Sequence, residues 1–424
     1  MTDYSKKIKL ILGPLLALVI YFGFDLMPGS PLVTKMAAVA VWMAVWWLTE
    51  VIHLAVTALL PIVLLPILGI ADSKTVAVQY MDPIIFLFIG GFIIAFAIER
   101  WHLHQRIALK ILMWVGTSPS RILLGIMLTS YLISMWISNT ATVMMLLSAV
   151  LAVIMQIEKH FVQEHHSHKM ATALLLGLAY SATIGGMATL VGTPTNMIFL
   201  RTYAEKFPDN HDMNFLAWFK IGFPLSLTFL FLAFFVLKKM FIKKDVELII
   251  DSGYFSGAYK RLGKMSFEEK MVATVFFVTA LLWFTRENID FGVIELKGWG
   301  TLFPNKSFLQ DSTVAIFMAL LLFFIPSKNV KGRALITWDE VSRLPFDIVL
   351  LFGGGFALAK GFELSGLSSW LASQLHFTPA TNIYVLIFGL CVLITIISEF
   401  ASNVACIQLM LPLLIAIQQT MNIH

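Results

Sequence analysis

The chain has 424 residues, of which 58% are hydrophobic and 13% charged, and its mean hydropathy is +0.84. An average soluble domain carries roughly 25% charged residues, so this composition excludes a water-soluble enzyme, a secreted domain and a disordered chain. The net charge of +5 fits loops that orient a membrane protein better than it fits a nucleic-acid partner. We therefore predict an all-α polytopic membrane protein.

Apolar blocks along the chain approach 20 residues, enough to cross a hydrocarbon core about 30 Å thick at ~1.5 Å per residue. Two further stretches, 121–156 and 383–418, are interrupted by polar residues, and we expect each to form a re-entrant hairpin. If the hairpins do not cross and the N-terminus is cytoplasmic, most Lys and Arg residues fall in cytoplasmic loops, as the positive-inside rule requires. The predicted full crossings are 8–27, 34–50, 51–71, 84–103, 170–204, 217–240, 269–286, 312–327 and 347–366.

The chain resembles itself at an offset of 264 residues, which aligns 87–147 with 351–411. An odd number of steps separates the two copies, so they must face opposite ways across the membrane. Inverted repeats with interrupted helices are typical of secondary transporters. The predicted organisation is an N-terminal span (1–33), a first repeat (34–244, with the hairpin 121–156 and a broken helix at 170–204), a cytoplasmic linker (245–268) and a second repeat (269–424, with spans over 269–366 and the hairpin 383–418).

The two hairpins carry the same polar motif at their turns, because 136–142 reads WISNTAT and 401–405 reads ASNVA. Lipid offers polar side chains no partner, so these residues need another reason to be there. Ser and Asn supply neutral oxygens for a hard cation such as Na⁺, and half-helices that begin at the turns can attract a carboxylate. The alternative is that these side chains only join helices. Their recurrence at matched positions favours a binding site.

A second interruption occurs at 185–196, which reads GGMATLVGTPTN. Pro194 removes a hydrogen-bond donor and disfavours helix at Thr193, so the predicted helix must break there. A bound ion or substrate would satisfy the freed backbone groups, and a proline kink that neighbouring helices accommodate is the alternative. The glycines at 90–91 and 353–355 predict close helix packing rather than ligand binding.

These motifs are accompanied by WWLTE at 46–50, FIGGFIIAFAIERW at 88–101, LFGGGFALAKGFELSGL at 351–367 and SEFASNVACIQLMLP at 398–412. Together they resemble the divalent-anion/sodium symporter family, whose members carry dicarboxylates and citrate. The resemblance implies a homodimer in the plasma membrane (the inner membrane of a bacterium), in which scaffold spans hold a transport domain that moves in an elevator-like step.

The resemblance also implies which residues bind the ions and the anion. The first Na⁺ site would consist of Ser134, Ser138, Asn139 and Gly192, and the second would use Ser398, Ala401 and Asn403. Val404 stands where the family pattern often has Thr, a change that bears on substrate choice. The implied contacts of the substrate carboxylates are Ser138, Asn139, Thr140, Thr193, Pro194, Ser402, Asn403 and Val404.

By the repeat offset, the counterpart of Gly192 would fall near residue 456, so we expect the second repeat to lack its last spans. The expected function is import of C4-dicarboxylates (succinate, malate or fumarate) by Na⁺ symport. Na⁺ is the expected coupling ion, and no enzyme activity, nucleic-acid partner or ATP site is expected. Two alternatives stay open. The chain could be a Na⁺-independent dicarboxylate exchanger of the same fold, or a non-transporting or truncated membrane protein that binds anions.

Overall fold

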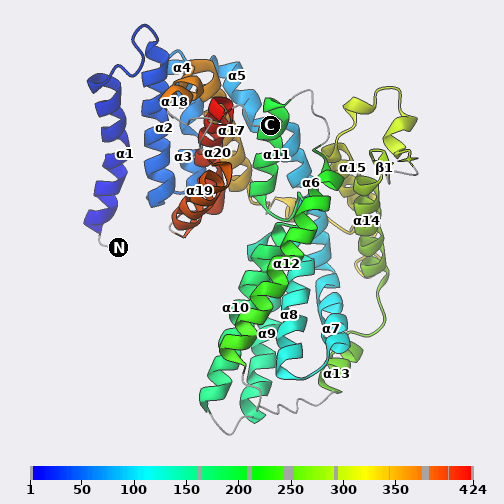
Figure 1. Ribbon diagram of the computed structural model, residues 1–424. Helices are drawn as coiled ribbons and strands as arrows, with labels where there is room; N and C mark the ends of the chain where they lie inside the picture. The colour runs from blue at the N-terminus through cyan, green and yellow to red at the C-terminus, as the bar shows by residue number, and fades with distance from the viewer. Residues whose placement is uncertain are drawn as a thin grey trace. The chain divides into compact units, whose positions relative to one another are not determined.

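The computed structural model describes residues 3–160, 164–207, 213–242, 253–290, 295–342, 344–374, 382–399 and 401–421. Its described part is almost entirely helical, with one short antiparallel strand pair, as the composition predicts (Figure 1). The longer helices are α1 (Asp3–Gly23), α2 (Pro31–Thr49), α6 (Pro83–Arg100), α7 (Leu103–Val115), α8 (Pro119–Ser134), α9 (Asn139–His160), α10 (Glu164–Gly186), α11 (Pro194–Lys206), α12 (Phe215–Phe241), α14 (Phe267–Phe284), α15 (Asp311–Phe324), α17 (Phe346–Ser365), α19 (Ile383–Ser398) and α20 (Asn403–Met421).

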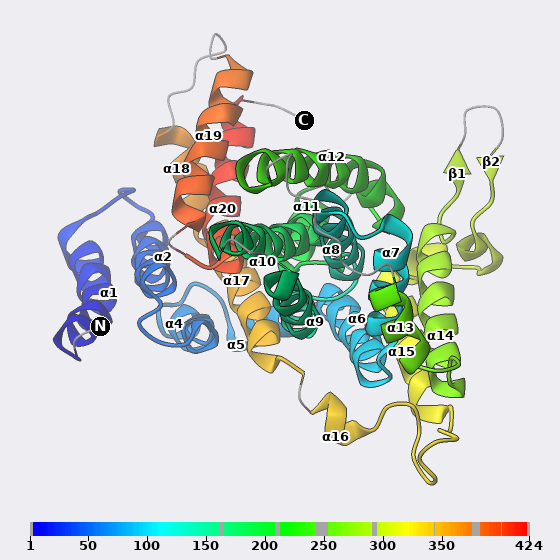
Figure 2. The ribbon, with the colours of Figure 1, turned by 90° about the horizontal axis from the view of Figure 1, so that it is seen from below.

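Short elements connect these helices. The helical ones are α3 (Leu54–Thr57), α4 (Leu60–Ile67), α5 (Ser73–Val78), η1 (Gln79–Met81), α13 (Gly253–Arg261), η2 (Trp299–Leu302), η3 (Lys306–Phe308), α16 (Trp338–Val341) and α18 (Leu367–Gln374). The strands β1 (Ile289–Asp290) and β2 (Glu295–Leu296) pair antiparallel, with Ile289 opposite Leu296, and Figure 2 shows them side by side.

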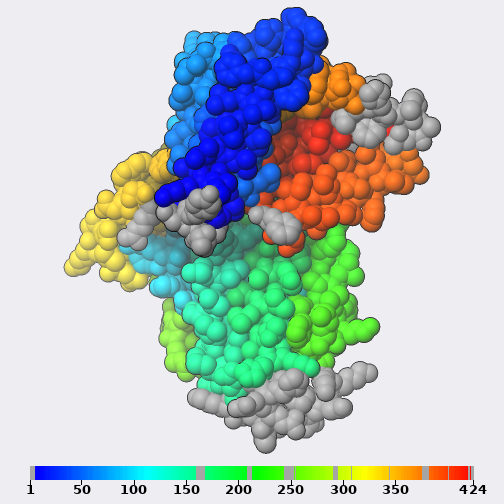
Figure 3. Space-filling view, turned by 90° about the vertical axis from the view of Figure 1, so that its left-hand side faces the viewer, coloured from blue at the N-terminus to red at the C-terminus, as the bar shows by residue number. Residues whose placement is uncertain are grey.

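Five of the described helical stretches are long and apolar enough to cross a membrane: Pro31–Thr49, Ser73–Arg100, Asn139–Glu158, Phe215–Phe241 and Phe346–Ser365. Large apolar side chains also face outward on other helices. On α1, which lies at the surface in Figure 3, Ile11 is 62% exposed and Phe22 79% exposed. Such side chains suit contact with lipid. The prediction of an all-α polytopic membrane protein is confirmed.

The chain divides into two compact units. The terminal unit comprises Met1–Ile85, Ile198–Glu205 and Pro345–His424, and the central unit comprises Phe86–Met197 and Lys206–Leu344. In the terminal unit, α17 is surrounded by α2, α3, α4, η1 and α20. In the central unit, α10 packs along α8, α9 and α12, and α7 contacts α8, α13 and α14.

Four of the five glycines at 90–91 and 353–355 allow close approach between helices, as predicted, and Gly91 is the exception. A Cβ atom added at Gly90 would lie 2.6 Å from the carbonyl carbon of Ala315. On α17, a Cβ added at Gly353 would lie 2.1 Å from Tyr80. One added at Gly354 would lie 2.5 Å from Ala58, and one added at Gly355 would lie 2.2 Å from Gln408. Side chains larger than hydrogen would therefore push these helices apart.

The predicted crossing at 51–71 is wrong in one respect, because the structure has two short helices there, α3 and α4, instead of one long helix. Pro61 lacks the N–H that would bond to the carbonyl of Thr57, the last residue of α3, and it lies in the first turn of α4, where a proline is tolerated. The two helices together cover only Leu54–Ile67. Residues 245–252 of the predicted linker lie outside the described residues, and its remainder contains α13 and the start of α14. The division into repeats stays a prediction.

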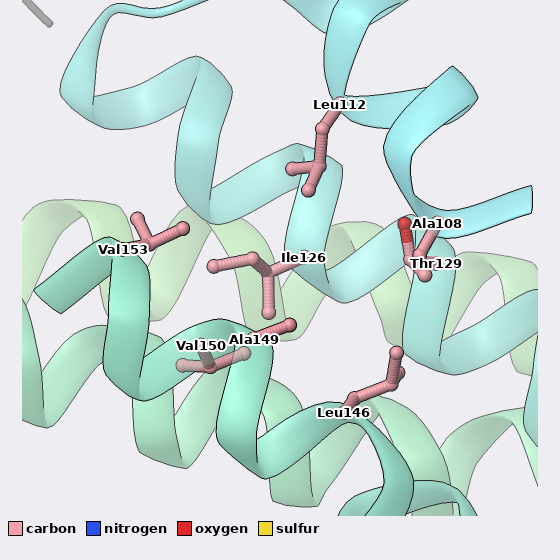
Figure 4. A pocket seen from close by; sticks show the side chains of 8 residues that line it. All are labelled: Ala108, Leu112, Ile126, Thr129, Leu146, Ala149, Val150 and Val153. Atoms are coloured by element: carbon pink, nitrogen blue, oxygen red, sulfur yellow. The ribbon is translucent and has the colours of Figure 1, made fainter. Parts of the chain in front are cut away.

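A small hollow lies among α7, α8 and α9 of the central unit (Figure 4). Its lining includes Leu112, Ile126, Leu146 and Val153, with Thr129 as the polar residue. The hydroxyl of Thr129 donates to the carbonyl of Gly125 at 2.7 Å. The lining therefore offers a ligand apolar contacts and no free polar group on Thr129.

Candidate functional site

The first polar tip is a tight turn between α8 and α9. Met135 N donates to the carbonyl of Tyr131 at 3.1 Å, and Trp136 N donates to the carbonyl of Ile133 at 3.0 Å. The hydroxyl of Ser134 donates to Oδ1 of Asn139 at 2.8 Å and thereby joins the two ends of the turn. Ser134 is fully buried, whereas Ser138 and Asn139 are half-buried. The break at 135–138 falls where the sequence predicts the hairpin turn.

The second interruption is also present, because α10 ends at Gly186 and α11 begins at Pro194. The unwound residues between them leave carbonyl groups without helical partners. The side-chain amide of Asn196 donates to the carbonyl of Gly186 at 2.9 Å and to that of Thr189 at 2.7 Å. Asn196 is 6% exposed, so its amide holds the break together inside the protein.

The first tip and the unwound segment between Gly186 and Pro194, here called the broken segment, lie against each other in the central unit. Thr189 Oγ1 donates to the carbonyl of Met135 in the turn. A Cβ added at Gly186 would lie 2.4 Å from Oδ1 of Asn139, and one added at Gly192 would lie 3.0 Å from the carbonyl oxygen of Met135. The glycines therefore bring the unwound backbone up to the tip.

This arrangement gathers the predicted first Na⁺ set around uncharged oxygens: Ser134 joins Asn139 directly, Ser138 lies next to Asn139 in the chain, and Gly192 borders the same turn. Hydroxyl, amide and backbone carbonyl oxygens are suitable ligands for a hard cation, and unwound backbone inside transporters coordinates Na⁺ in this way.

The same cluster also offers donors to an anion. The helices α9 and α11 begin at Asn139 and Pro194, so the positive ends of two helix dipoles are at the tip and the break. Thr140 is exposed, while Thr193 and Pro194 are half-buried, which leaves these three predicted substrate contacts accessible.

Comparison with known proteins adds an independent observation. A family model described as citrate transporter matches residues 44–424. The sodium-dependent dicarboxylate transporter SdcS of Staphylococcus saprophyticus subsp. saprophyticus is 38% identical over 427 residues, which cover 100% of this chain and 80% of that protein. The protein of the same name from Staphylococcus aureus is 38% identical over 429 residues, covering 99% of this chain and 79% of the relative.

The chain belongs to the citrate-transporter family. The resemblance to sodium-coupled dicarboxylate and citrate transporters that its motifs suggest is thereby confirmed. It is an integral membrane protein, because it belongs to a transporter family and five helical stretches among its described residues are fit to cross a membrane. The family indicates a transporter rather than an enzyme.

The second polar tip of this citrate-transporter-family chain, between α19 and α20, belongs to the terminal unit and differs from the first tip. The hydroxyl of Ser398 donates to the carbonyl of Thr395 at 2.9 Å, and Ala401 N donates to that of Ile397 at 3.1 Å. Asn403 is exposed. These bonds stay within α19 and its end, so they do not join Ser398 or Ala401 to Asn403. The second Na⁺ set stays a prediction, as do the substrate contacts of Ser402, Asn403 and Val404.

Three residues of the first site carry no role in the sequence prediction. Thr189 and Asn196 bond the broken segment to the tip and to itself. Thr142 lies in the first turn of α9, where its hydroxyl is buried and has no hydrogen-bond partner. For Asn196 a sequence signal exists: an amide two residues after Pro194 can reach back to the carbonyls of the break. Thr189 has no comparable signal.

Proposed function

We propose that this chain imports C4-dicarboxylates such as succinate, malate and fumarate by Na⁺ symport. The cluster of uncharged oxygens at the first tip supports this most directly, because Ser134, Asn139 and the carbonyl of Met135 meet the unwound segment there. The names of the SdcS relatives, sodium-dependent dicarboxylate transporters, support the same ion and substrate class.

Charge compensation explains why an anion carrier would use Na⁺. A dianion loses a large hydration free energy when it leaves water. Ion ligands and anion donors that share one tip allow the two charges to bind as a nearly neutral unit. If more positive than negative charge enters in each cycle, each net charge gains about 2.3 kcal/mol per 100 mV of inside-negative potential.

The finer features are part of the same proposal: an elevator-like step, a homodimer, two inverted repeats, a cytoplasmic N-terminus and insertion in the bacterial inner membrane. The first Na⁺ would bind Ser134, Ser138, Asn139 and Gly192, and the second would bind Ser398, Ala401 and Asn403. The substrate carboxylates would meet Ser138, Asn139, Thr140, Thr193 and Pro194 of the first half and Ser402, Asn403 and Val404 of the second.

Uptake of radiolabelled succinate into proteoliposomes, with Na⁺ or choline outside, tests the proposal. We expect uptake that depends on an inward Na⁺ gradient, and Asn139→Ala should abolish that dependence, because Asn139 Oδ1 lies at the centre of the cluster. Uptake that persists in choline and is stimulated by preloaded succinate would show a Na⁺-independent exchanger instead. Succinate binding without accumulation would show a non-transporting protein.

A further inference from the structure

An aromatic stack lies next to the first tip in the central unit. Trp136, in the turn itself, stacks on Phe215 with ring centroids 5.9 Å apart and planes at 19°. It also lies parallel to Trp283 at 6.4 Å and 5°, and Phe276 meets its edge at 4.9 Å and 89°. Phe215 and Trp283 stack on each other at 4.9 Å. One residue of the turn is therefore held by three rings from α12 and α14.

A buried carboxylate fixes the rings that hold Trp136. Asp311, the first residue of α15, accepts a hydrogen bond from Phe215 N at 3.1 Å and an ion-pair hydrogen bond from Nε of Arg286 at 2.7 Å. The carbonyl of Asp311 accepts from Nε1 of Trp283 at 2.9 Å. Asp311 is 7% exposed, and Arg286 compensates its charge. The stack is thus attached to a hydrogen-bonded polar junction between α12, α14 and α15.

The position of Trp136 links this stack to the cluster of uncharged oxygens at the first tip. Trp136 follows Met135, whose carbonyl accepts the hydrogen bond from Thr189, and precedes Ser138 by two residues. A small hollow borders both Trp136 and Val191 of the unwound segment. If the stacking partners were lost, the indole would have space to move, and the turn that carries Ser138 would move with it.

We propose that Trp136 is a positioning residue that holds the first tip in the conformation that binds Na⁺. The inference rests on the proposed Na⁺ symport. A turn that samples several conformations binds an ion more weakly, because only the competent fraction of molecules can bind it. This role requires an aromatic ring at position 136. Phe should therefore preserve Na⁺ binding there, and an aliphatic residue should weaken it.

The test compares Trp136→Leu with Trp136→Phe in the full chain. The measurements are the Na⁺ concentration for half-maximal succinate uptake in proteoliposomes, and amide hydrogen exchange over residues 133–142. We expect Trp136→Leu to raise the half-maximal Na⁺ concentration roughly tenfold and to speed exchange of the tip, since aromatic pairs contribute measurably beyond their buried area. Trp136→Phe should stay within about twofold of the wild type in both measurements.

Phe276→Leu removes only the edge-on ring and should raise the half-maximal Na⁺ concentration about threefold, a milder variant in case Trp136→Leu does not fold. Trp114→Leu is the matched control, because Trp114 is 84% exposed on α7 and takes no part in the stack. Unchanged tip exchange in Trp136→Leu and Phe276→Leu would overturn the proposal. If wild-type uptake ignores Na⁺ while Trp136→Leu speeds exchange, the symport proposal fails, and with it the role in Na⁺ binding; only the ordering of the tip by Trp136 is then supported.

Discussion

Gly186 is the residue at which a single added methyl group should test the first ion site most sharply. In Gly186→Ala, the new Cβ would lie 2.4 Å from Oδ1 of Asn139, whereas ordinary contacts begin near 3.4 Å. The amide of Asn139 would have to move by about 1 Å, and displacements of that size at a binding centre cost up to ~100-fold in function. We therefore expect the half-maximal Na⁺ concentration for uptake to rise roughly ten- to hundredfold, equivalent to about 1.4–2.8 kcal/mol.

The chain offers a matched control on α6, where Gly91 also lies near the broken segment. In Gly91→Ala, the new Cβ would lie 3.7 Å from the nearest atom, Cγ1 of Val191, which is ordinary contact, so Na⁺ dependence should not change. The assay is succinate uptake into proteoliposomes against Na⁺ concentration, with thermal unfolding in detergent to confirm that both variants fold. Wild-type Na⁺ dependence in Gly186→Ala would refute the assignment of Asn139 as an ion ligand.

Three further predictions concern the stability of the central unit, measured as thermal unfolding of the purified protein. Asn196→Leu leaves two carbonyls of the break without their buried donor and should destabilise by about 1–3 kcal/mol for each carbonyl; an unchanged melting temperature would contradict this. Arg106→Ala removes the partner of the buried Glu269 and should cost about 3–5 kcal/mol, more than Lys110→Ala on the exposed side of the same helix. Glu268 should make the protein less stable as the pH is lowered. Burial alone would raise the pKa of its carboxyl, but the hydrogen bonds it accepts outweigh burial and lower that pKa from 4.5 to about 2. The unfolded chain then binds the proton more readily, so stability should be level above pH 4.5 and decrease toward pH 2, and the same decrease in Glu268→Gln would refute the assignment.

The helices and their interruptions could be predicted from the sequence because their causes are local. The expected crossing 217–240 corresponds to α12 (Phe215–Phe241), and the expected breaks occur at 135–138 and before Pro194. Runs of apolar residues and the missing N–H of proline act within a few residues of the position they affect. The same reasoning, applied to Pro61, would have predicted the separation of α3 and α4.

The partners of the first tip could not be predicted in this way. Trp136 stacks on Trp283, which lies 147 positions further along the chain, and Thr189 bonds to the carbonyl of Met135. Neither contact follows from periodicity or from a motif, because a carbonyl has no sequence signature and the stack depends on how three helices pack. The residues that hold the site are consequently harder to predict than the residues that would bind the ligand.

The two tips show how little a motif determines without its surroundings. Ser134 and Ser398 occupy matched positions, yet Ser134 is buried and bonds across the turn to Asn139, while Ser398 bonds back to the carbonyl of its own helix. A serine hydroxyl in a helix donates to the preceding turn unless a better acceptor is held within reach. At the first tip, Gly186 leaves room for Asn139 to be that acceptor, and Thr189 fixes the turn. The Ser-Asn motif therefore supplies oxygens, and the broken helix packed against it arranges them into a site.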